Sequence, residues 1–254
     1  MGFKPLLISV AFFAASGVMA DVTEEQTWTF DLDSGGRISL ENINGNVTVT
    51  GGSGGEVEIV ALKKAGSQEY LDGIEIIIDD SADAIRIETK HPDKGVKGWF
   101  NWGKDSSGSV TYTLNVPSDV NLESVESVNG NVSVSGVHGV VKAGTVNGQV
   151  DATDLSSDAR IETVNGSVHA TFASLKGHQK ANCESVNGRV TVELPDDADA
   201  SVSAETINGG IDGSDFGLKA NKGFVGRDLE GEIGDGEARL SLSTVNGSIK
   251  IRNE

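Results

Sequence analysis

Apolar and polar residues alternate along most of the chain, and turns rich in glycine and asparagine interrupt the alternation. A period of two places successive side chains on opposite faces of a strand, so this pattern predicts half-buried β-strands. Clear examples are 57–60, 84–87 and 110–117. Residues 63–72 are compatible with a short helix or an irregular loop. No stretch of useful length has helical periodicity, so the sequence predicts an all-β protein.

A six-residue motif recurs along the chain: a small polar residue, Val or Ile, Asn, Gly, any residue, and Val or Ile. Its Asn and Gly residues are expected to form structural turns at Asn44, Gly45, Asn129, Gly130, Asn147, Gly148, Asn165, Gly166, Asn187, Gly188, Asn208, Gly209, Asn246 and Gly247. From Asn129 the spacings are 18, 18, 22, 21 and 38 residues, the last about two ordinary steps. A period near 20 with a preserved turn predicts a repeat architecture.

Aligning the repeats on Asn gives columns that continue the alternation. The residues four before Asn are small or apolar, and those five before are polar. Three before stand Glu41, Glu126, Gly144, Glu162, Glu184, Glu205 and Ser243. Two architectures fit: an antiparallel meander or sandwich with Asn-Gly hairpins, or a β-solenoid of 18–22-residue coils with Asn-Gly corners. Stacked coils explain the constant columns, but they bring the Glu residues close together, which requires solvent screening or a bound cation.

Composition and charge narrow the function classes. Apolar residues make up 37% of the 254 residues and aromatic residues 5%, so the expected core is aliphatic. The formal net charge is −18, which disfavours nucleic acid as a partner because phosphate binding relies on cationic side chains. Residues 1–20 combine Lys4, an apolar run and small residues before Asp21, a pattern that predicts a cleaved signal peptide. Because Lys4 is the only charged residue in 1–20, cleavage takes the charge from −18 to −19. No later segment is apolar enough to span a membrane.

The chain resembles a known family in several features. These are the signal peptide, the weakly patterned N-terminal β region, the recurring Val-Asn-Gly-x-Val, and the C-terminal 236–251 segment, Gly-Glu-Ala-Arg-Leu-Ser-Leu-Ser-Thr-Val-Asn-Gly-Ser-Ile-Lys-Ile. Over about residues 30–252 it is similar to the bacterial putative-adhesin family of β-strand-repeat envelope proteins, a domain of unknown function. The resemblance implies a β-solenoid-like fold and an extracytoplasmic location, and it supplies no catalytic residues. We therefore expect a signal peptide at 1–20, an irregular N-terminal β region at 21–119 with an aromatic loop at 90–109, and the regular repeats at 120–254.

The candidate functional residues are few. Trp99, Phe100 and Trp102 form a short aromatic cluster that is suited either to binding a partner or to covering one end of the stack. Cys183 stands in an apolar column and is expected to be a small buried residue. The four His residues share no column, and no ligand spacing accompanies them, so we expect no metal site, cofactor or catalytic residues.

The sequence thus predicts an exported, non-enzymatic β-repeat protein that serves as an adhesion or envelope-interaction scaffold. We expect it in the periplasm, on the cell surface or secreted. Its expected partner is an envelope protein or a surface glycan, not nucleic acid. Two alternatives remain open: an enzyme that acts on polysaccharide through solenoid carboxylates, and a calcium-dependent structural module. The Asn-Gly pairs are interpreted as corners, and function is expected where the repeat lapses, in 90–109 and 212–238.

Overall fold

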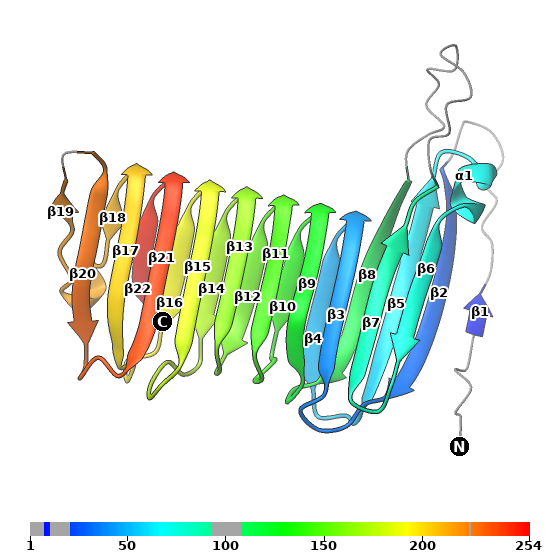
Figure 1. Ribbon diagram of the computed structural model, residues 1–254, viewed down its shortest axis with the longest axis horizontal. Coiled ribbons are helices and arrows are strands. Elements are labelled where there is room, and N and C mark those ends of the chain that lie inside the picture. The colour runs from blue at the N-terminus through cyan, green and yellow to red at the C-terminus, as the bar shows by residue number, and fades with distance from the viewer. Residues whose placement is uncertain (1–7, 11–20, 93–107, 224) are drawn as a thin grey trace, which may run out of the picture.

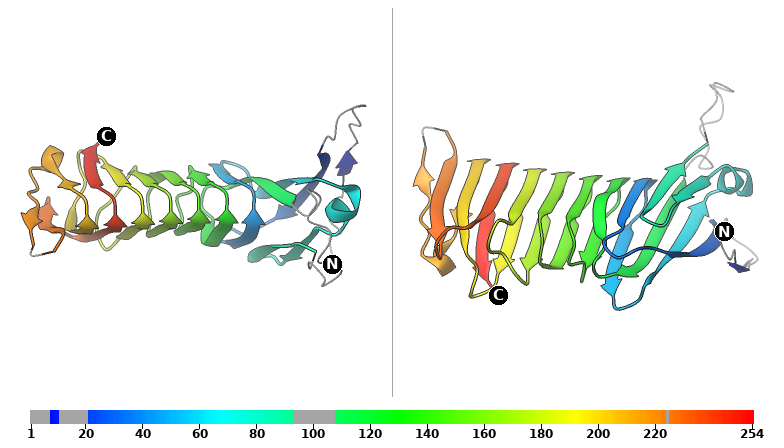
Figure 2. Two further views of the ribbon diagram at one scale, coloured as in Figure 1. Left: turned by 90° about the horizontal axis from the view of Figure 1, so that it is seen from above. Right: turned by 60° about the horizontal axis from the view of Figure 1, so that its bottom comes forward.

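Two long β-sheets face each other along the whole molecule (Figures 1 and 2). The computed structural model describes residues 8–10, 21–92, 108–223 and 225–254. Sheet A contains, in spatial order, β1 (Ile8–Val10), β2 (Val22–Asp31), β5 (Glu56–Ala65), β8 (Gly108–Pro117), β4 (Val47–Gly52), β10 (Val132–Ser135), β12 (Val150–Leu155), β14 (Val168–Phe172), β16 (Val190–Leu194), β22 (Ile249–Asn253) and β18 (Ile211–Asp212). Sheet B contains β19 (Asn221–Lys222), β20 (Arg227–Ile233), β17 (Ala200–Asn208), β21 (Ala238–Asn246), β15 (Lys180–Asn187), β13 (Ala159–Asn165), β11 (Val141–Asn147), β9 (Asn121–Asn129), β3 (Arg37–Asn44), β7 (Ala84–Lys90) and β6 (Glu75–Asp80). The helical elements are α1 (Gln68–Asp72) and a short 3-10 turn, η1 (Ser214–Phe216).

The repeats are coils of a β-solenoid. In each coil a strand of sheet B ends at the motif Asn, the chain turns a corner at Gly, and a strand of sheet A follows. Neighbouring coils pair in parallel and in register, so that Asn147 lies beside Asn165 and Val150 beside Val168. The predicted solenoid is confirmed, and the alternative antiparallel meander is wrong for the repeats. Antiparallel pairs occur instead at the two ends of the stack, for example between β2 and β5 and between β17 and β20.

The spatial order of the coils differs from their order in the sequence. The C-terminal coil, formed by β21 and β22, lies between the coil of β15 and β16 and the coil of β17 and β18. Its Asn246 pairs with Asn187 on one side and with Asn208 on the other. The 38-residue spacing between Asn208 and Asn246 is therefore not a double step along the stack. It accommodates β19 and β20, which cover the outer edge of β17 before the chain returns to fill the gap.

Polar ladders hold the corners together. From Asn129 onward, the side-chain amide of each motif Asn donates to the side-chain oxygen of the Asn in the adjacent coil, for example from Asn165 to Asn147 at 2.9 Å and from Asn246 to Asn187 at 2.7 Å. The backbone also pairs, since the Gly148 N–H donates to the Asn165 carbonyl oxygen at 3.1 Å. Stacked amides satisfy one another only when every coil supplies the same residue, which explains why Asn recurs at this position.

Glycine is required at most corners by close packing between coils. An alanine Cβ at Gly130 would lie 2.1 Å from the Gly45 carbonyl oxygen, and one at Gly166 would lie 1.7 Å from the Gly148 carbonyl oxygen. Among the corner glycines, Gly45 has a positive φ, at 122°, and the motif Asn residues do not. A type I′ hairpin needs positive φ at both central residues, so these corners are not the hairpin turns that Asn-Gly often forms.

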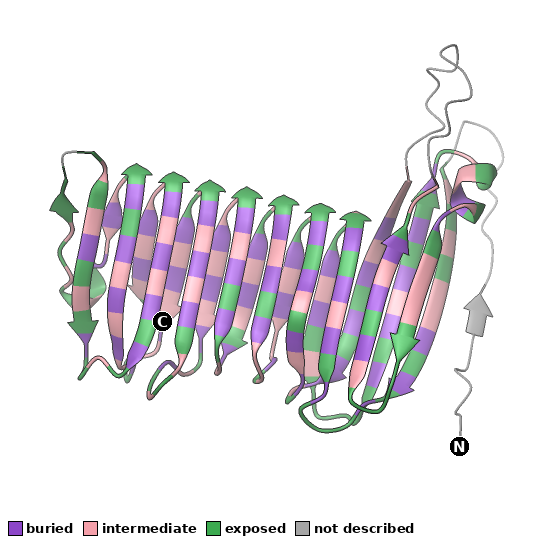
Figure 3. Ribbon diagram, viewed as in Figure 1, coloured by how far each residue is buried: buried purple, intermediate pink, exposed green. Residues whose placement is uncertain are grey.

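Aliphatic side chains from both sheets fill the space between them. Burial alternates along most strands (Figure 3), and Val, Ile, Leu and Ala at the inward positions form one continuous core. At the N-terminal end this core also contains Trp28 and Tyr112, and the Tyr112 hydroxyl lies 2.7 Å from the Thr89 hydroxyl of the opposite sheet. The predicted aliphatic core is therefore confirmed, with a few rings at the N-terminal end and Phe172 of β14 in the middle of the stack.

Cys183 lies in this core between Ile161 and Leu242 of the two adjacent strands. It is fully buried, as its column predicts. Burial, with a smaller contribution from the charge of Glu184, raises the pKa of its thiol to about 12. Because the thiolate is the reactive form, we expect native protein to resist the thiol reagent DTNB at pH 8, whereas unfolded protein should release one equivalent of thionitrobenzoate within minutes. Rapid labelling of the native protein would show that the core opens around Cys183.

Candidate functional site

A groove of about 870 Å³ runs across the outer face of sheet B, close to the corners. We call it the stack groove. It crosses the strands from β7 and β3 at one end to β17 and β20 at the other, so that each coil contributes the same three positions to it. These positions are one, two and three residues before the motif Asn. The stacking therefore turns three sequence columns into three parallel rows.

The first row is aliphatic and exposed. The residue just before each Asn points outward, and between 37% and 52% of its surface is accessible. In spatial order this aliphatic row consists of Ile43, Val128, Val146, Val164, Val186, Val245 and Ile207. Single exposed apolar side chains are ordinary, but a contiguous stripe is typical of a binding surface.

The second row consists of hydroxyl groups. Each side-chain hydroxyl two residues before Asn donates to the carbonyl oxygen of the glycine in the adjacent coil, for example from Thr163 to Gly148 at 2.9 Å and from Thr244 to Gly188 at 2.9 Å. The hydroxyl row is Ser127, Thr145, Thr163, Ser185, Thr244 and Thr206. Asn42 takes this position in the first coil and donates to the Gly45 and Val110 carbonyl oxygens. The residues of the hydroxyl row are buried, and since a hydroxyl has one proton, none of them has a hydrogen left to donate to a ligand in the groove.

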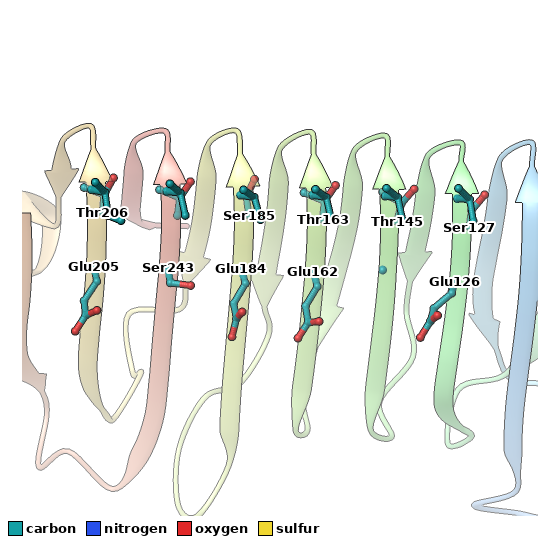
Figure 4. Close-up of a pocket in the computed structure, with 18 of the residues that line it drawn as sticks. Glu126, Ser127, Thr145, Glu162, Thr163, Glu184, Ser185, Glu205, Thr206 and Ser243 are labelled. Carbon is teal, nitrogen blue, oxygen red and sulfur yellow. The ribbon is translucent and has the colours of Figure 1, made fainter. Parts of the chain in front are cut away.

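The third row carries carboxylates. The in-register row across sheet B is Glu88, Glu41, Glu126, Gly144, Glu162, Glu184, Ser243, Glu205 and Asp228. In Figure 4 the labelled Glu side chains extend in one direction along their strands, away from the hydroxyl row. Arg86 pairs with Glu41 at 3.1 Å, Lys90 with Glu88 at 3.6 Å, and Arg160 pairs with Glu162. Within the described ranges, Glu126, Glu184, Glu205 and Asp228 have no such cationic partner.

The inserted C-terminal coil relieves part of the repulsion that a column of Glu predicts. In the sequence order of repeats, Glu184 and Glu205 are neighbours, but in space Ser243 lies between them (Figure 4). Gly144 makes a similar gap between Glu126 and Glu162. Like charges on directly adjacent strands destabilise a sheet, so these two small residues and the three ion pairs reduce that cost.

The His and acidic side chains in the described part of the chain bear on whether the protein holds a metal ion or acts on polysaccharide. No group of three or more His, Cys, Asp or Glu side chains there is placed to hold a metal ion. The carboxylates lie side by side on one wall, whereas glycoside hydrolysis uses two carboxyl groups on opposite sides of the bond that is cleaved. His138 lies 3.3 Å from Asp154, and His169 lies 3.3 Å from Glu193 and 3.7 Å from Asp151. Among the described residues, no hydrogen bond joins a Ser to either His.

The site proposed from the sequence and the groove seen in the structure involve different residues. Trp99, Phe100 and Trp102 lie outside the described residues. The Asn-Gly corners lie at the rim of sheet B, beside the groove and not within its lining. Of the irregular 212–238 segment, Val225, Arg227 and Asp228 close one end of the groove. A sequence signal for the groove existed: the Val or Ile before each Asn has the outward parity of the polar columns, yet it is always apolar.

No helix among the residues with assigned positions has the length and apolar character that crossing a bilayer requires.

Comparison with known proteins gives a family match. The family model described as Toastrack DUF4097 matches residues 34–252. The structure of a putative cell adhesion protein from Clostridium sporogenes is similar to this one. The alignment covers 91% of this chain and 100% of that protein's chain, at 14% identity and a TM-score of 0.48. For a putative adhesin from Bacteroides fragilis, the alignment covers 92% of this chain and 98% of that protein's chain, at 11% identity and a TM-score of 0.32. No curated protein matches the chain. The parallel strand pairing and the family match both indicate a β-solenoid-like fold.

Proposed function

The chain belongs to the Toastrack DUF4097 family, and from this premise we propose that it is a non-enzymatic scaffold that contacts an adhesion target or another envelope component through the stack groove. The targeting pattern at 1–20 supports export, and therefore a periplasmic, cell-surface or secreted location. The names of the two similar solved proteins refer to adhesion, which is compatible with this proposal.

The observation that carries the proposal is the exposed aliphatic row. Seven consecutive coils each place a Val or Ile at an outward position, where the solvent-facing side of a sheet normally carries a polar residue. Exposing these side chains to water is unfavourable by about 25 cal/mol for each Å² of apolar surface. A partner that covers the row would recover this free energy. The stacked coils also hold the aliphatic row in place before a partner arrives, so little conformational entropy is lost on binding.

The proposal is tested by changing two members of the row. Replacing Val164 and Val186 together with Thr keeps the shape of both side chains and adds a hydroxyl to each. We expect the double variant to keep its fold and melting temperature but to lose most of its binding to washed cell envelopes of the source organism, measured by sedimentation. The matched control is Val60→Thr on the outer face of β5, which should bind like the wild type. Equal binding by the double variant and the wild type would refute the groove as the contact surface.

A further inference from the structure

The stack groove offers hydrogen-bond acceptors and very few donors. Its carboxylates only accept hydrogen bonds when ionised. The protons of its hydroxyl row are engaged with glycine carbonyl oxygens, as in the bond from Thr145 to Gly130 at 2.8 Å. Arg227 is the one cationic side chain in its lining that the structure describes. A partner that fits this lining must therefore supply the donors.

The charge of the groove identifies those donors as cationic. Glu126, Glu184, Glu205 and Asp228 lack a cationic partner within the described chain, and they lie on one wall. A partly desolvated carboxylate that gains an ammonium or guanidinium partner forms a charge-assisted hydrogen bond, which is about twice as strong as a neutral one. The net charge of −18 also accelerates the approach of a positive segment at low salt. Anionic lipid headgroups and phosphate-rich polymers are repelled by the same groups.

The aliphatic row adds a second requirement. The wall opposite the carboxylates consists of Val and Ile side chains, and the described residues that line the groove include no aromatic ring. Sugar rings usually stack on aromatic faces, so this wall suits aliphatic side chains better than a glycan. A partner with cationic groups along one side and apolar groups along the other satisfies both walls. Such a partner is a segment of polypeptide in which Lys or Arg alternates with aliphatic residues.

The gaps in the carboxylate row indicate an extended conformation. Gly144 and Ser243 are separated by three steps in the stack, through β13 and β15. At about 4.8 Å for each step, the two gaps lie roughly 14 Å apart. An extended chain advances about 3.4 Å for each residue, so its residues i and i+4 lie roughly 14 Å apart and point to the same side. Two bulky side chains four residues apart could therefore enter both gaps.

We propose that the stack groove binds an extended cationic segment of a partner polypeptide, with its Lys or Arg side chains on the carboxylate row and its apolar side chains on the aliphatic row. This inference rests on the proposed function and specifies the chemistry of the partner. The seven members of the aliphatic row span six steps of about 4.8 Å, or roughly 29 Å, which accommodates about nine extended residues.

The test uses a fluorescein-labelled nine-residue peptide of alternating Lys and Val, with the full-length protein and fluorescence anisotropy. We expect the Lys-Val peptide to bind more tightly than peptides of alternating Lys and Ser or Glu and Val. The variant Glu184→Gln with Glu205→Gln should bind the Lys-Val peptide about tenfold more weakly, because two charge-assisted contacts are lost. The control Glu56→Gln with Glu58→Gln changes the net charge equally on β5 of sheet A, and it should change the affinity less than twofold.

Two further variants test the walls of the groove separately. Val164→Thr with Val186→Thr should lower the affinity for the Lys-Val peptide. It should leave the lower affinity for the Lys-Ser peptide unchanged. Gly144→Gln fills one gap without altering the charge, and we expect it to reduce affinity several-fold, whereas simple attraction to an acidic surface predicts no change. Unchanged melting temperatures confirm that each variant is folded.

Several outcomes would overturn the inference. One is that the two Glu double variants bind the Lys-Val peptide with equal affinity. Another is that the wild type binds the Lys-Val and Lys-Ser peptides equally well. A third is that the Lys-Val peptide does not bind at low salt. Concentration-dependent dimerisation that Val164→Thr with Val186→Thr abolishes would assign the groove to a second copy of this chain instead. If envelope binding depends on the aliphatic row while the cationic peptide fails to bind, the proposed function stands and this inference falls. If the peptide binds the groove but substitutions in the aliphatic row leave envelope binding unchanged, the proposed function falls.

Discussion

Replacing Gly166 with alanine should lower the free energy of unfolding by about 3 kcal/mol, at the upper end of the range for overpacking a close-packed interior. The alanine Cβ would lie 1.7 Å from the Gly148 carbonyl oxygen and 2.5 Å from the Gly148 carbonyl carbon. Both atoms belong to the backbone of the adjacent coil, so no side-chain rotation can relieve the overlap. The coils would have to separate, which would also stretch the Asn165 to Asn147 ladder. Urea denaturation followed by circular dichroism measures the effect.

Gly144→Ala is the matched control for this prediction. Gly144 belongs to a neighbouring coil, and an added Cβ would meet the Glu162 carbonyl oxygen at 3.4 Å, an ordinary contact distance. Other coils carry Glu or Ser at the same position. We therefore expect the control to change stability by less than about 0.5 kcal/mol, or to increase it slightly because alanine restricts the unfolded chain. Equal losses for the two variants would mean that glycine at the corners is required by backbone flexibility and not by the close approach of the coils.

A chain that ends at Asp235 should lose the structure of the last coil in the stack as well as the coil that is deleted. The deletion removes β21 and β22, including the buried side chains of Leu240, Leu242, Ile249 and Ile251. Their burial contributes on the order of 8 kcal/mol of hydrophobic free energy. It also removes the parallel partner of β17, with which β17 pairs from Ala200 to Asn208. Hydrogen–deuterium exchange should show fast exchange over 200–233 and retained protection over 121–170.

The same sample contains its own control, since the coils at 121–170 do not touch β21 or β22. Adding a synthetic peptide of residues 236–254 to the truncated chain should restore protection over 200–233, because the gap between β15 and β17 fits this one coil. Retained protection without the peptide would contradict the prediction. It would show that β17 closes directly onto β15 and that the C-terminal coil does not hold the end of the stack in place.

The local features of the fold could be predicted from the sequence. The alternation of apolar and polar residues gave the strands and their inward faces, and the columns gave the constant corners and the buried Cys183. These properties depend on the parity of each position in its own strand, so they can be read without knowing which coils are neighbours. The family resemblance then favoured the solenoid over the meander, a choice that the parity of a two-residue turn leaves open.

The candidate site could be predicted only in part. The Glu column was evident, and so was the problem of placing like charges side by side. The groove was not predicted, because it arises only when three columns are stacked into rows: aliphatic at Val164, hydroxyl at Thr163 and carboxylate at Glu162. In the sequence these three adjacent residues belong to an ordinary strand that leads into a turn. The sequence analysis therefore placed function where the repeat lapses, and the structure directs attention to the repeat itself.

By itself, the sequence determined that the chain forms similar coils with an aliphatic core and Asn-Gly corners. Only the tertiary structure decided the order in which the coils stack. Every coil presents the same columns, so the coil of Asn208 has edges that fit the coil of Asn187 as well as the coil of Asn246. The choice depends on the cover formed by β19 and β20 and on the return of the chain, which are long-range features. That choice places Ser243 between Glu184 and Glu205, and it thereby sets the pattern of charge along the groove.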